Sequence, residues 1–158
     1  PYGGPLAHVL GFVGRINESE QAKLDKERYR GSYFVGKAGI ELHYEDRLLG
    51  QPGFDEMETD AYGRMLRKVG TIPAKNGENL TLTIDYDLQA KAFELLGEEK
   101  GSIVAIDPRN GEVLALVSKP GFDPNVFVLG IDHDSYQALI DAKDKPLFNR
   151  FLRGQYPP

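Results

Sequence analysis

The feature that most restricts the fold of this chain is a pair of apolar runs, residues 103–106 and 112–117, joined by a short polar turn. The turn contains Asn110-Gly111, and an Asn-Gly step between two apolar runs is a strong signal for a β-hairpin. Two strands alone are marginally stable in water, and a single helix can cover only one of their faces. The pattern therefore predicts a wider sheet, whose other strands would come later in a longer protein; the residues that require it are Val104, Leu114 and Leu116.

The charge distribution divides the chain into two parts. Of its 158 residues, 24 are acidic and 19 are basic, which gives a net charge of −5. Bases and acids balance in residues 1–75, so the whole acidic excess lies in residues 76–158. The turn-rich sequence Pro73-Ala74-Lys75-Asn76-Gly77 lies at the changeover and predicts a domain boundary there. Because an acidic surface repels phosphate, no nucleic acid is expected as a partner.

Short helices and strands are predicted in residues 1–75. A half-buried strand is expected over Ala7–Val13, and Asn17 with Glu20 forms a capping box for a helix that ends near Leu24. A second helix is expected over Gly39–Leu49, with a left-handed cap at Gly50. The runs Phe54–Thr59 and Arg64–Val69 predict a hairpin.

Residues 76–158 give clearer signals. Alternation predicts a half-buried strand over Leu80–Ile84, followed by a helix that is capped by Asp85 and ended by Gly97. The hairpin at 103–117 follows, and a third helix is expected to begin at Asp134 or Ser135. The mixture of segregated helices and hairpins predicts an α+β fold class.

Composition and termini narrow the setting. The chain has no cysteine, which excludes disulfides, thiolate zinc sites and cysteine nucleophiles. No apolar run approaches the ~18 residues that a membrane helix needs, and no basic segment followed by an apolar one marks a signal peptide. The chain starts at Pro1 and stops at Pro158, and we interpret it as a piece of a longer protein.

No serine stands in a motif for nucleophilic catalysis. None lies in G-x-S-x-G or is followed by lysine at the third position, and K-T-G is absent. Caps, turns and strand ends are therefore the expected roles of these serines: Ser19, Ser32, Ser102, Ser118 and Ser135. The run from Gly31 to Ala38 matches G-x-x-x-x-G-K but places Ala38 where Ser or Thr would bind Mg²⁺, so a nucleotide site is disfavoured.

Metal and carboxylate sites are also disfavoured. The histidines His8, His43 and His133 are far apart in sequence and share no ligand spacing, so no metal and no cofactor is predicted. Glu41 and Glu45 are four residues apart, which is typical of a solvated helix face. The residues alone thus predict a soluble α+β fragment with no catalytic residue in this chain.

Many spaced positions resemble class B penicillin-binding proteins over essentially the whole chain. Residues 1–75 resemble the pedestal, or dimerisation, domain of that family; the positions that carry the likeness are Gly36, Gly39, Glu41, Tyr44, Glu45, Gly63 and Arg64. Residues 76–158 resemble the N-terminal edge of the transpeptidase domain, which would be incomplete here, through Asp85, Gln89 and Asp107. The elongation-type subgroup, the penicillin-binding protein 2 group, is indicated by Asn125, Asn149, Arg150 and residues 154–158.

This resemblance implies a periplasmic D,D-transpeptidase that an N-terminal anchor outside this chain tethers to the inner membrane. Such enzymes cross-link peptidoglycan stem peptides through a serine that β-lactams acylate. In the family the S-x-x-K motif follows within a few residues of Tyr-Pro-Pro, and this chain ends at Pro158. The fragment would therefore hold the pedestal and the first edge of the catalytic domain, without nucleophile or base.

The resemblance also implies partners. In relatives of this type the pedestal contacts the rod-shape scaffold protein MreC and the glycan polymerase RodA. The alternative is a free-standing periplasmic protein-interaction module with no enzymatic parent. The gene discriminates between them, because S-x-x-K directly after Pro158 supports the first interpretation and its absence supports the second.

The purified chain of residues 1–158 is expected to show no covalent labelling by fluorescent penicillin, because no serine is followed by lysine at the third position. Gel fluorescence after denaturation measures this. A labelled band from the purified chain would contradict the prediction.

Overall fold

The hairpin that the apolar runs predict is present as β5 (Gly101–Ile106) and β6 (Val113–Lys119), which pair antiparallel. The structure is a computed structural model that describes residues 3–155. Within that range the β5–β6 sheet has two strands. Ala115 and Val117 of β6 are fully buried, whereas Val104 and Ile106 of β5 are 49% and 55% exposed. Val104 and Ile106 lie on the face opposite Ala115 and Val117, so one face of the hairpin is covered and the other is only partly covered within residues 3–155.

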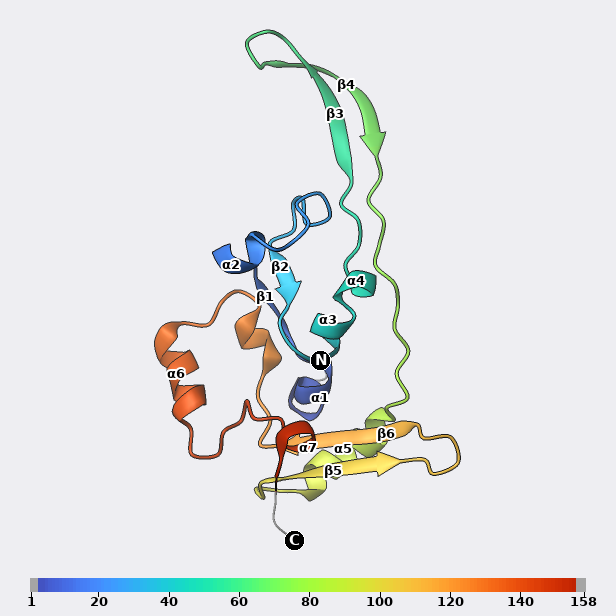
Figure 1. Cartoon of the computed structure of the whole chain (residues 1–158), viewed down its shortest axis with the longest axis vertical. Coiled ribbons are helices and arrows are strands. Elements are labelled where there is room, and N and C mark those ends of the chain that lie inside the picture. Colours follow the sequence, from blue (N-terminus) through green and yellow to red (C-terminus); the bar gives the residue numbers. More distant parts are fainter. Residues whose placement is uncertain (1–2, 156–158) are drawn as a thin grey trace.

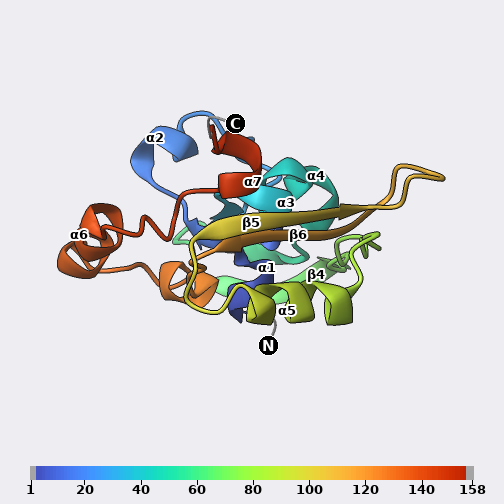
Figure 2. The same ribbon diagram turned by 90° about the horizontal axis from the view of Figure 1, so that it is seen from below.

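Helix α5 (Tyr86–Leu95) covers one face of this hairpin, and α7 (Arg150–Arg153) lies on the other (Figure 2). The predicted cap of α5 is confirmed, because the Asp85 side chain accepts a hydrogen bond from the Leu88 N–H at 3.0 Å. Gly97 has φ +53° just after the helix, which is the predicted left-handed end.

The outer edge of β6 is closed by the Gln89 side chain instead of a further strand. Gln89 of α5 is 0% exposed. Its Nε2 donates to the carbonyls of Leu116 and Pro5, both at 2.7 Å, and its Oε1 accepts from the Leu116 N–H at 2.7 Å. Nearby, the Asp85 N–H donates to the Leu114 carbonyl at 2.9 Å. Further strands can therefore join this sheet at the β5 edge, which pairs with no other strand in residues 3–155.

The predicted strand over Ala7–Val13 is wrong. Residues Gly3–Leu10 form helix α1, and β1 begins only at Val13 (Val13–Arg15). The buried side chains of α1 are Leu6, Ala7 and Val9, a helical spacing that a short apolar run does not distinguish from alternation. Gly11, at φ +77°, ends the helix, and its N–H donates to the Ala7 carbonyl at 2.9 Å.

Helix α1 joins the two halves of the chain. It packs against β6 and α5, and also against α3 (Gly39–His43) and the short 3-10 helix η1 (Pro124–Phe127). The next residues continue this junction, because the rings of Phe12 and Phe127 stack at 4.2 Å. The N-terminal helix thus lies among residues of the C-terminal half (Figures 1 and 2).

The predicted capping box at Asn17 is confirmed, but its helix is shorter than expected. Helix α2 spans Glu18–Gln21 and does not extend to Leu24. None of its residues is buried, so packing does not stabilise a longer helix. The chain then returns through a loop to β2 (Phe34–Gly36), which pairs antiparallel with β1.

The single helix predicted over Gly39–Leu49 is divided at Tyr44. Helix α3 is followed by α4 (Glu45–Leu48), and Tyr44 between them has φ −108° and ψ 20°. Neither piece buries a residue, so no continuous apolar stripe holds one straight helix. The predicted left-handed cap at Gly50 is also wrong: a Cβ at Gly50 would lie 2.4 Å from the Lys75 carbonyl oxygen, so this glycine serves a close backbone approach.

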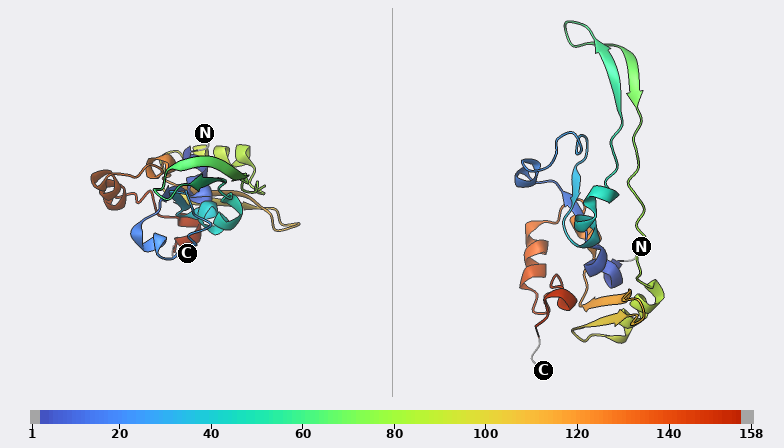
Figure 3. Two further views of the ribbon diagram at one scale, coloured as in Figure 1. Left: turned by 90° about the horizontal axis from the view of Figure 1, so that it is seen from above. Right: turned by 45° about the vertical axis from the view of Figure 1, so that its right-hand side comes forward.

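Strands β3 (Phe54–Thr59) and β4 (Met65–Ile72) form the predicted second hairpin. It projects as an arm from the end of two connecting segments, far from the β5–β6 hairpin (Figure 1, and Figure 3, right). Every residue of β3 is exposed. Ion pairs cross the arm, such as Lys68 Nζ to Asp55 Oδ1 at 2.6 Å. Strand β4 extends beyond the predicted Val69 because the ladder continues to Phe54 opposite Ile72.

The strand predicted over Leu80–Ile84 is wrong, although its alternation is real. Leu80, Leu82 and Ile84 are half-buried and the two threonines between them are exposed, but no strand forms. The segment makes isolated contacts with β6, such as the Thr83 hydroxyl donating to the Val113 carbonyl at 2.7 Å. Burial of alternate side chains therefore occurs here without a ladder.

The remaining helices follow their caps. Helix α6 (His133–Asp141) begins slightly earlier than predicted because Asp132 is the N-cap, accepting from the Ser135 N–H at 2.9 Å. Helix α7 is capped by Asn149. Within residues 3–155, every helix is too short or too polar to cross a lipid bilayer.

Replacing Gln89 by alanine is expected to destabilise the protein by about 3 kcal/mol, because the buried N–H and C=O of Leu116 lose their partners. Urea unfolding followed by circular dichroism measures this change. Gln137→Ala is the matched control: the Gln137 amide donates to Asp141 on an exposed face of α6, so its loss should cost within about 0.5 kcal/mol. Equal effects of the two substitutions would contradict the assigned role of Gln89.

Candidate functional site

The serines do not form a catalytic site. Ser118 is buried, but its hydroxyl donates to the Phe148 carbonyl at 3.3 Å and accepts from the Arg150 N–H at 3.0 Å. Ser19 and Ser32 donate to oxygens two residues away, as cap and turn residues do. The chemistry of these serines is therefore structural within residues 3–155.

Neither the run that resembles a phosphate loop nor the histidines form a ligand site in the described residues. Residues 34–36 of that run are strand β2, and the Lys37 ammonium pairs with Glu20 of α2. A phosphate loop needs free backbone N–H groups, which a paired strand does not offer. Among residues 3–155, no three His, Asp or Glu side chains converge in a way that could hold a metal ion.

Five of the predicted family positions converge around α3 and α4. Glu45 is their centre: its Oε2 accepts from the Gly36 N–H at 2.8 Å and its Oε1 accepts from the Tyr29 hydroxyl at 3.1 Å. Burial and the Glu45 carboxylate raise the pKa of Tyr29 to about 12. This carboxylate therefore holds strand β2, helix α4 and the loop that carries Tyr29 together.

Glu41, Gly36 and Gly39 surround that carboxylate. Partial burial and the nearby charge of Glu45 raise the pKa of Glu41. A Cβ at Gly36 would lie 2.1 Å from the Glu41 carbonyl oxygen. Gly39 has φ +61°, and its backbone lies against that of Gly11. Glycine is needed at both positions because backbones meet there.

Tyr44 lies at the edge of the same group and is 36% exposed. The Arg47 guanidinium lies 5.9 Å from its ring centroid, and the His43 ring meets it edge-on at 4.8 Å. The other two pedestal positions are elsewhere: Gly63 (φ +79°) and Arg64 are at the tip of the arm, where Arg64 Nε donates to Asp60 Oδ2 at 2.7 Å.

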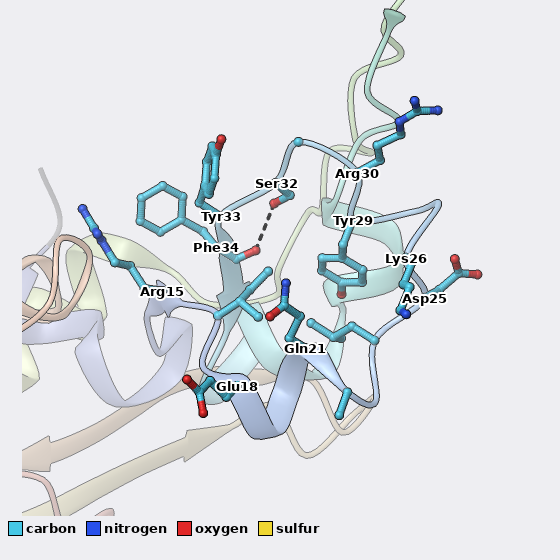
Figure 4. A pocket seen from close by; sticks show the side chains of 14 residues that line it. Arg15, Glu18, Gln21, Asp25, Lys26, Tyr29, Arg30, Ser32, Tyr33 and Phe34 are labelled. Atoms are coloured by element: carbon cyan, nitrogen blue, oxygen red, sulfur yellow. Dashed lines mark hydrogen bonds between the residues drawn. The ribbon is translucent and has the colours of Figure 1, made fainter.

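A wide hollow lies beside this group. It has a volume of about 1090 Å³ and is formed by β1, α2, β2 and the loop between α2 and β2 (Figure 4). Tyr33 at its rim is 75% exposed, and both signs of charge line it, with Arg15, Lys26 and Glu18 among them. Its openness, aromatic rim and mixed charge suit contact with another protein better than enclosure of a small ligand.

Gln89, Asn149 and Arg150 form a second group at the junction of α1, β6 and α7. Asn149 caps α7 and its Nδ2 donates to the His8 carbonyl at 3.5 Å. Arg150 is 8% exposed, and its guanidinium donates to the backbone carbonyls of residues 144, 145 and 148. These residues hold the segment before α7 against the β5–β6 hairpin.

The other predicted positions are caps and turns. Asp107 accepts from the Arg109 side chain and N–H, and these bonds lower its pKa. Asn125 lies in η1, where both its N–H and its Nδ2 donate to Asp123 Oδ1. Asp85 caps α5 as described. The family positions Tyr156, Pro157 and Pro158 lie outside the described residues.

Two side chains that contact these groups were not identified from the sequence. Tyr29 bonds Glu45 because the loop after α2 folds back over α4, and His8 lies in the helix that the sequence predicted as a strand. The period of the run around His8, read with the glycine at position 11 as a helix end, is the signal that would have indicated a helix.

Comparison with known families and curated proteins gives consistent matches. The model of the penicillin-binding protein dimerisation domain matches residues 1–82, and that of the penicillin-binding protein transpeptidase domain matches residues 101–158. The chain is 49% identical over 158 residues to the peptidoglycan D,D-transpeptidase MrdA of Acinetobacter baumannii, covering 100% of this chain and 24% of that protein. It is 42% identical over 162 residues to MrdA of Escherichia coli K12, covering 100% of this chain and 26% of that protein.

Solved structures agree with these matches. Penicillin-binding protein 2 of Pseudomonas aeruginosa, in complex with WCK 5153, superposes with a TM-score of 0.84 at 42% identity, covering 100% of this chain and 31% of that one. Penicillin-binding protein 2 of Helicobacter pylori, in complex with MreC, gives a TM-score of 0.81 at 34% identity, covering 96% of this chain and 28% of that one.

The chain spans about a quarter of the length of the curated relatives it matches. The α+β fold class predicted from the sequence is confirmed, as is the resemblance to elongation-type relatives. Residues 1–82 match the dimerisation domain and residues 101–158 match the start of the transpeptidase domain, so this chain belongs to the penicillin-binding proteins.

Proposed function

We propose that this chain is the non-catalytic support of a peptidoglycan D,D-transpeptidase of the elongation type. The observation that carries the proposal is the succession of a dimerisation match and a transpeptidase match in one chain. A free-standing interaction module is not expected to contain the start of a catalytic domain. The relatives named D,D-transpeptidase support the same conclusion.

The proposed reaction needs catalytic residues that this sequence does not contain. In such enzymes a serine attacks the carbonyl of a D-Ala-D-Ala stem peptide, and the last D-Ala leaves. The amine of a second stem peptide then takes the acyl group, and a β-lactam traps the serine at the first step. The lysine that activates this serine belongs to an S-x-x-K motif, which this sequence does not contain.

We place the pedestal in residues 1–75 and the N-terminal edge of the transpeptidase domain in residues 76–158. The group around Glu45 fixes the pedestal, and the group around Arg150 fixes the edge of the catalytic half. Helix α1 is shared, since it contacts α3 on one side and β6 with α5 on the other. The role we assign to the family positions of these two groups is to hold segments of the chain in place.

The open edge of β5 is the place where the catalytic domain is completed. The outer edge of β6 is closed by Gln89, whereas β5 pairs only with β6 in residues 3–155. Further strands would pair with the free N–H and C=O groups of this edge and widen the face that carries Val104 and Ile106, which are about half exposed here.

The longer protein that contains this chain is expected to be labelled covalently by fluorescent penicillin and to release D-Ala from a D-Ala-D-Ala stem peptide, while residues 1–158 do neither. Gel fluorescence and a D-Ala assay measure these activities. Replacing the serine of S-x-x-K by alanine in the longer protein should abolish both. A longer protein that folds but neither binds penicillin nor releases D-Ala would refute the proposed activity.

We further propose that the pedestal half docks MreC and RodA, and that the longer protein works in the periplasm with an inner-membrane anchor. The Helicobacter pylori relative, solved as a complex with MreC, supports the first partner. The hollow beside α2 is the surface we assign to MreC, because it is concave, aromatic at its rim and formed by pedestal residues.

Residues 1–158 are expected to bind the periplasmic part of MreC from the same organism saturably, as measured by biolayer interferometry. Tyr33→Ala should weaken this binding by about tenfold, because Tyr33 is the exposed aromatic residue of the hollow. Tyr62→Ala is the control, since Tyr62 is 87% exposed at the tip of the arm. No saturable binding would refute the partner, and an unchanged affinity in Tyr33→Ala would refute the surface.

A further inference from the structure

Nearly the same tetrapeptide occurs twice in this chain. Lys75-Asn76-Gly77-Glu78 and Arg109-Asn110-Gly111-Glu112 each hold an Asn-Gly step between a basic residue and a glutamate, and the sequence has no other Asn-Gly step. Asparagine before glycine loses its side-chain amide readily, because glycine has no side chain to hinder attack of its backbone nitrogen on the asparagine Cγ. Since the neighbours match, a difference in reactivity between the two steps must come from the fold.

The step at Asn110 is protected by the turn of the β5–β6 hairpin. The Gly111 N–H donates to the Asp107 carbonyl at 2.8 Å, and the Asn110 Oδ1 accepts from the Glu112 N–H at 3.0 Å. The Asp107 N–H also donates to the Glu112 carbonyl at 2.8 Å, which closes the turn. Both reacting groups are therefore engaged, and the turn must open before they can meet.

The step at Asn76 has no such protection. Asn76 is exposed and lies in a segment, residues 76–80, that forms neither helix nor strand. Among residues 3–155, neither the Asn76 side chain nor the Gly77 N–H has a hydrogen-bond partner. The Gly77 nitrogen can therefore reach the Asn76 side chain without the opening of a turn or a ladder.

The fold requires glycine at position 77. A Cβ at Gly77 would lie 1.8 Å from the carbonyl oxygen of Leu48, the last residue of α4. The segment that returns from the arm passes against this helix end, and only glycine fits there. The close approach of the two backbones thus excludes the side chains that would slow the reaction at Asn76.

We propose that Asn76 is a modification site of this protein, which deamidates spontaneously in the folded chain while Asn110 is protected. The proposal concerns the chain itself and does not depend on the activity or the partners proposed above.

The reaction needs only water. The Gly77 nitrogen attacks the Asn76 Cγ and gives up its proton, the side-chain nitrogen takes up a proton and leaves as ammonia, and a five-membered succinimide forms. Water then opens the ring: addition at the side-chain carbonyl gives aspartate, and addition at the main-chain carbonyl gives isoaspartate. The balance is amide and water to carboxylate and ammonium.

Isoaspartate at position 76 would loosen the base of the arm, because it inserts a CH₂ group into the backbone between two fixed points. On one side, Lys75 and Gln51 exchange backbone hydrogen bonds of 2.8 and 2.9 Å. On the other side, the Glu78 N–H donates to the Arg47 carbonyl at 2.7 Å, and Arg47 Nε pairs with the Glu78 carboxylate at 2.7 Å. These contacts join the two segments that carry the arm to each other and to α4 (Figure 1).

The test is to keep residues 1–158 folded at neutral pH for several weeks and to measure amide loss at each asparagine by peptide mass spectrometry. Digestion at mildly acidic pH prevents loss during handling, and synthetic peptides identify aspartate and isoaspartate. Asn76 should react at least about tenfold faster than Asn110, because hydrogen bonds hold both groups of the second step. In concentrated urea, where the turn is open, the two rates should become similar.

Asn76→Gln is the matched variant, because it keeps an amide but disfavours ring closure, and Asn110→Gln is its control. Asn76→Gln should abolish the early product, whereas Asn110→Gln should age like the unmodified chain. Equal rates at the two steps in the folded chain, faster loss at Asn110, or a difference that persists in urea would refute the proposed site. The unmodified chain alone decides this, even if a variant fails to fold.

Hydrogen exchange of the aged chain tests the structural consequence. The amides of Gln51, Lys75 and Glu78 should lose protection in the fraction that carries isoaspartate, while those of β5 and β6 keep it. Aged Asn76→Gln should keep protection at all of these positions. Unchanged protection at Gln51 and Glu78 in the isoaspartate fraction would refute the loosening of the arm.

Discussion

The pairing of the Gln89 amide with the free edge of β6 is the interaction on which the C-terminal half depends. A backbone N–H and C=O at a sheet edge must find partners when they are buried, and Leu116 finds both in one side chain. Because the same Nε2 also donates to the Pro5 carbonyl, this amide ties α1 to α5 and β6. It also determines where the sheet can grow, since closing β6 leaves β5 as the edge that accepts further strands.

The N-terminal half is organised by a carboxylate in a comparable way. Glu45 accepts from the backbone of β2 and from the Tyr29 hydroxyl, and so connects a short strand, a short helix and a loop that have little apolar packing of their own. The hollow beside α2 owes its shape to this connection, because Tyr29 and the strand β2 both line it. This half of the chain is therefore held by a few polar contacts around one carboxylate, with an open surface beside them.

Local signals in the sequence were reliable where a residue acts on its near neighbours. The caps at Asn17 and Asp85, the glycine at the end of α5 and the turn at 107–111 were all predicted, because each depends on a few adjacent residues. Predictions failed where distant packing decided the outcome. The run around Ala7 became a helix that β6, α5 and α3 surround. Residues 80–84 formed no strand because they make only isolated hydrogen bonds to β6 in place of a ladder. The helix over residues 39–49 divided because no neighbour covers a continuous stripe.

Motifs and spacings along the chain were enough to identify the family, the α+β class, the hairpins and the lack of a nucleophile motif, since none of these needs a distant contact to be recognised. Three features emerged only from the folded chain: α1 contacts both halves, Gln89 closes one sheet edge, and His8 contacts Pro120 and Phe122. These contacts join residues far apart in the chain: Gln89 lies 27 positions from Leu116 and 84 from Pro5, and His8 lies 112 from Pro120. Their energies come from burying polar groups against exact partners, and periodicity along the chain carries no information about which distant group that partner is.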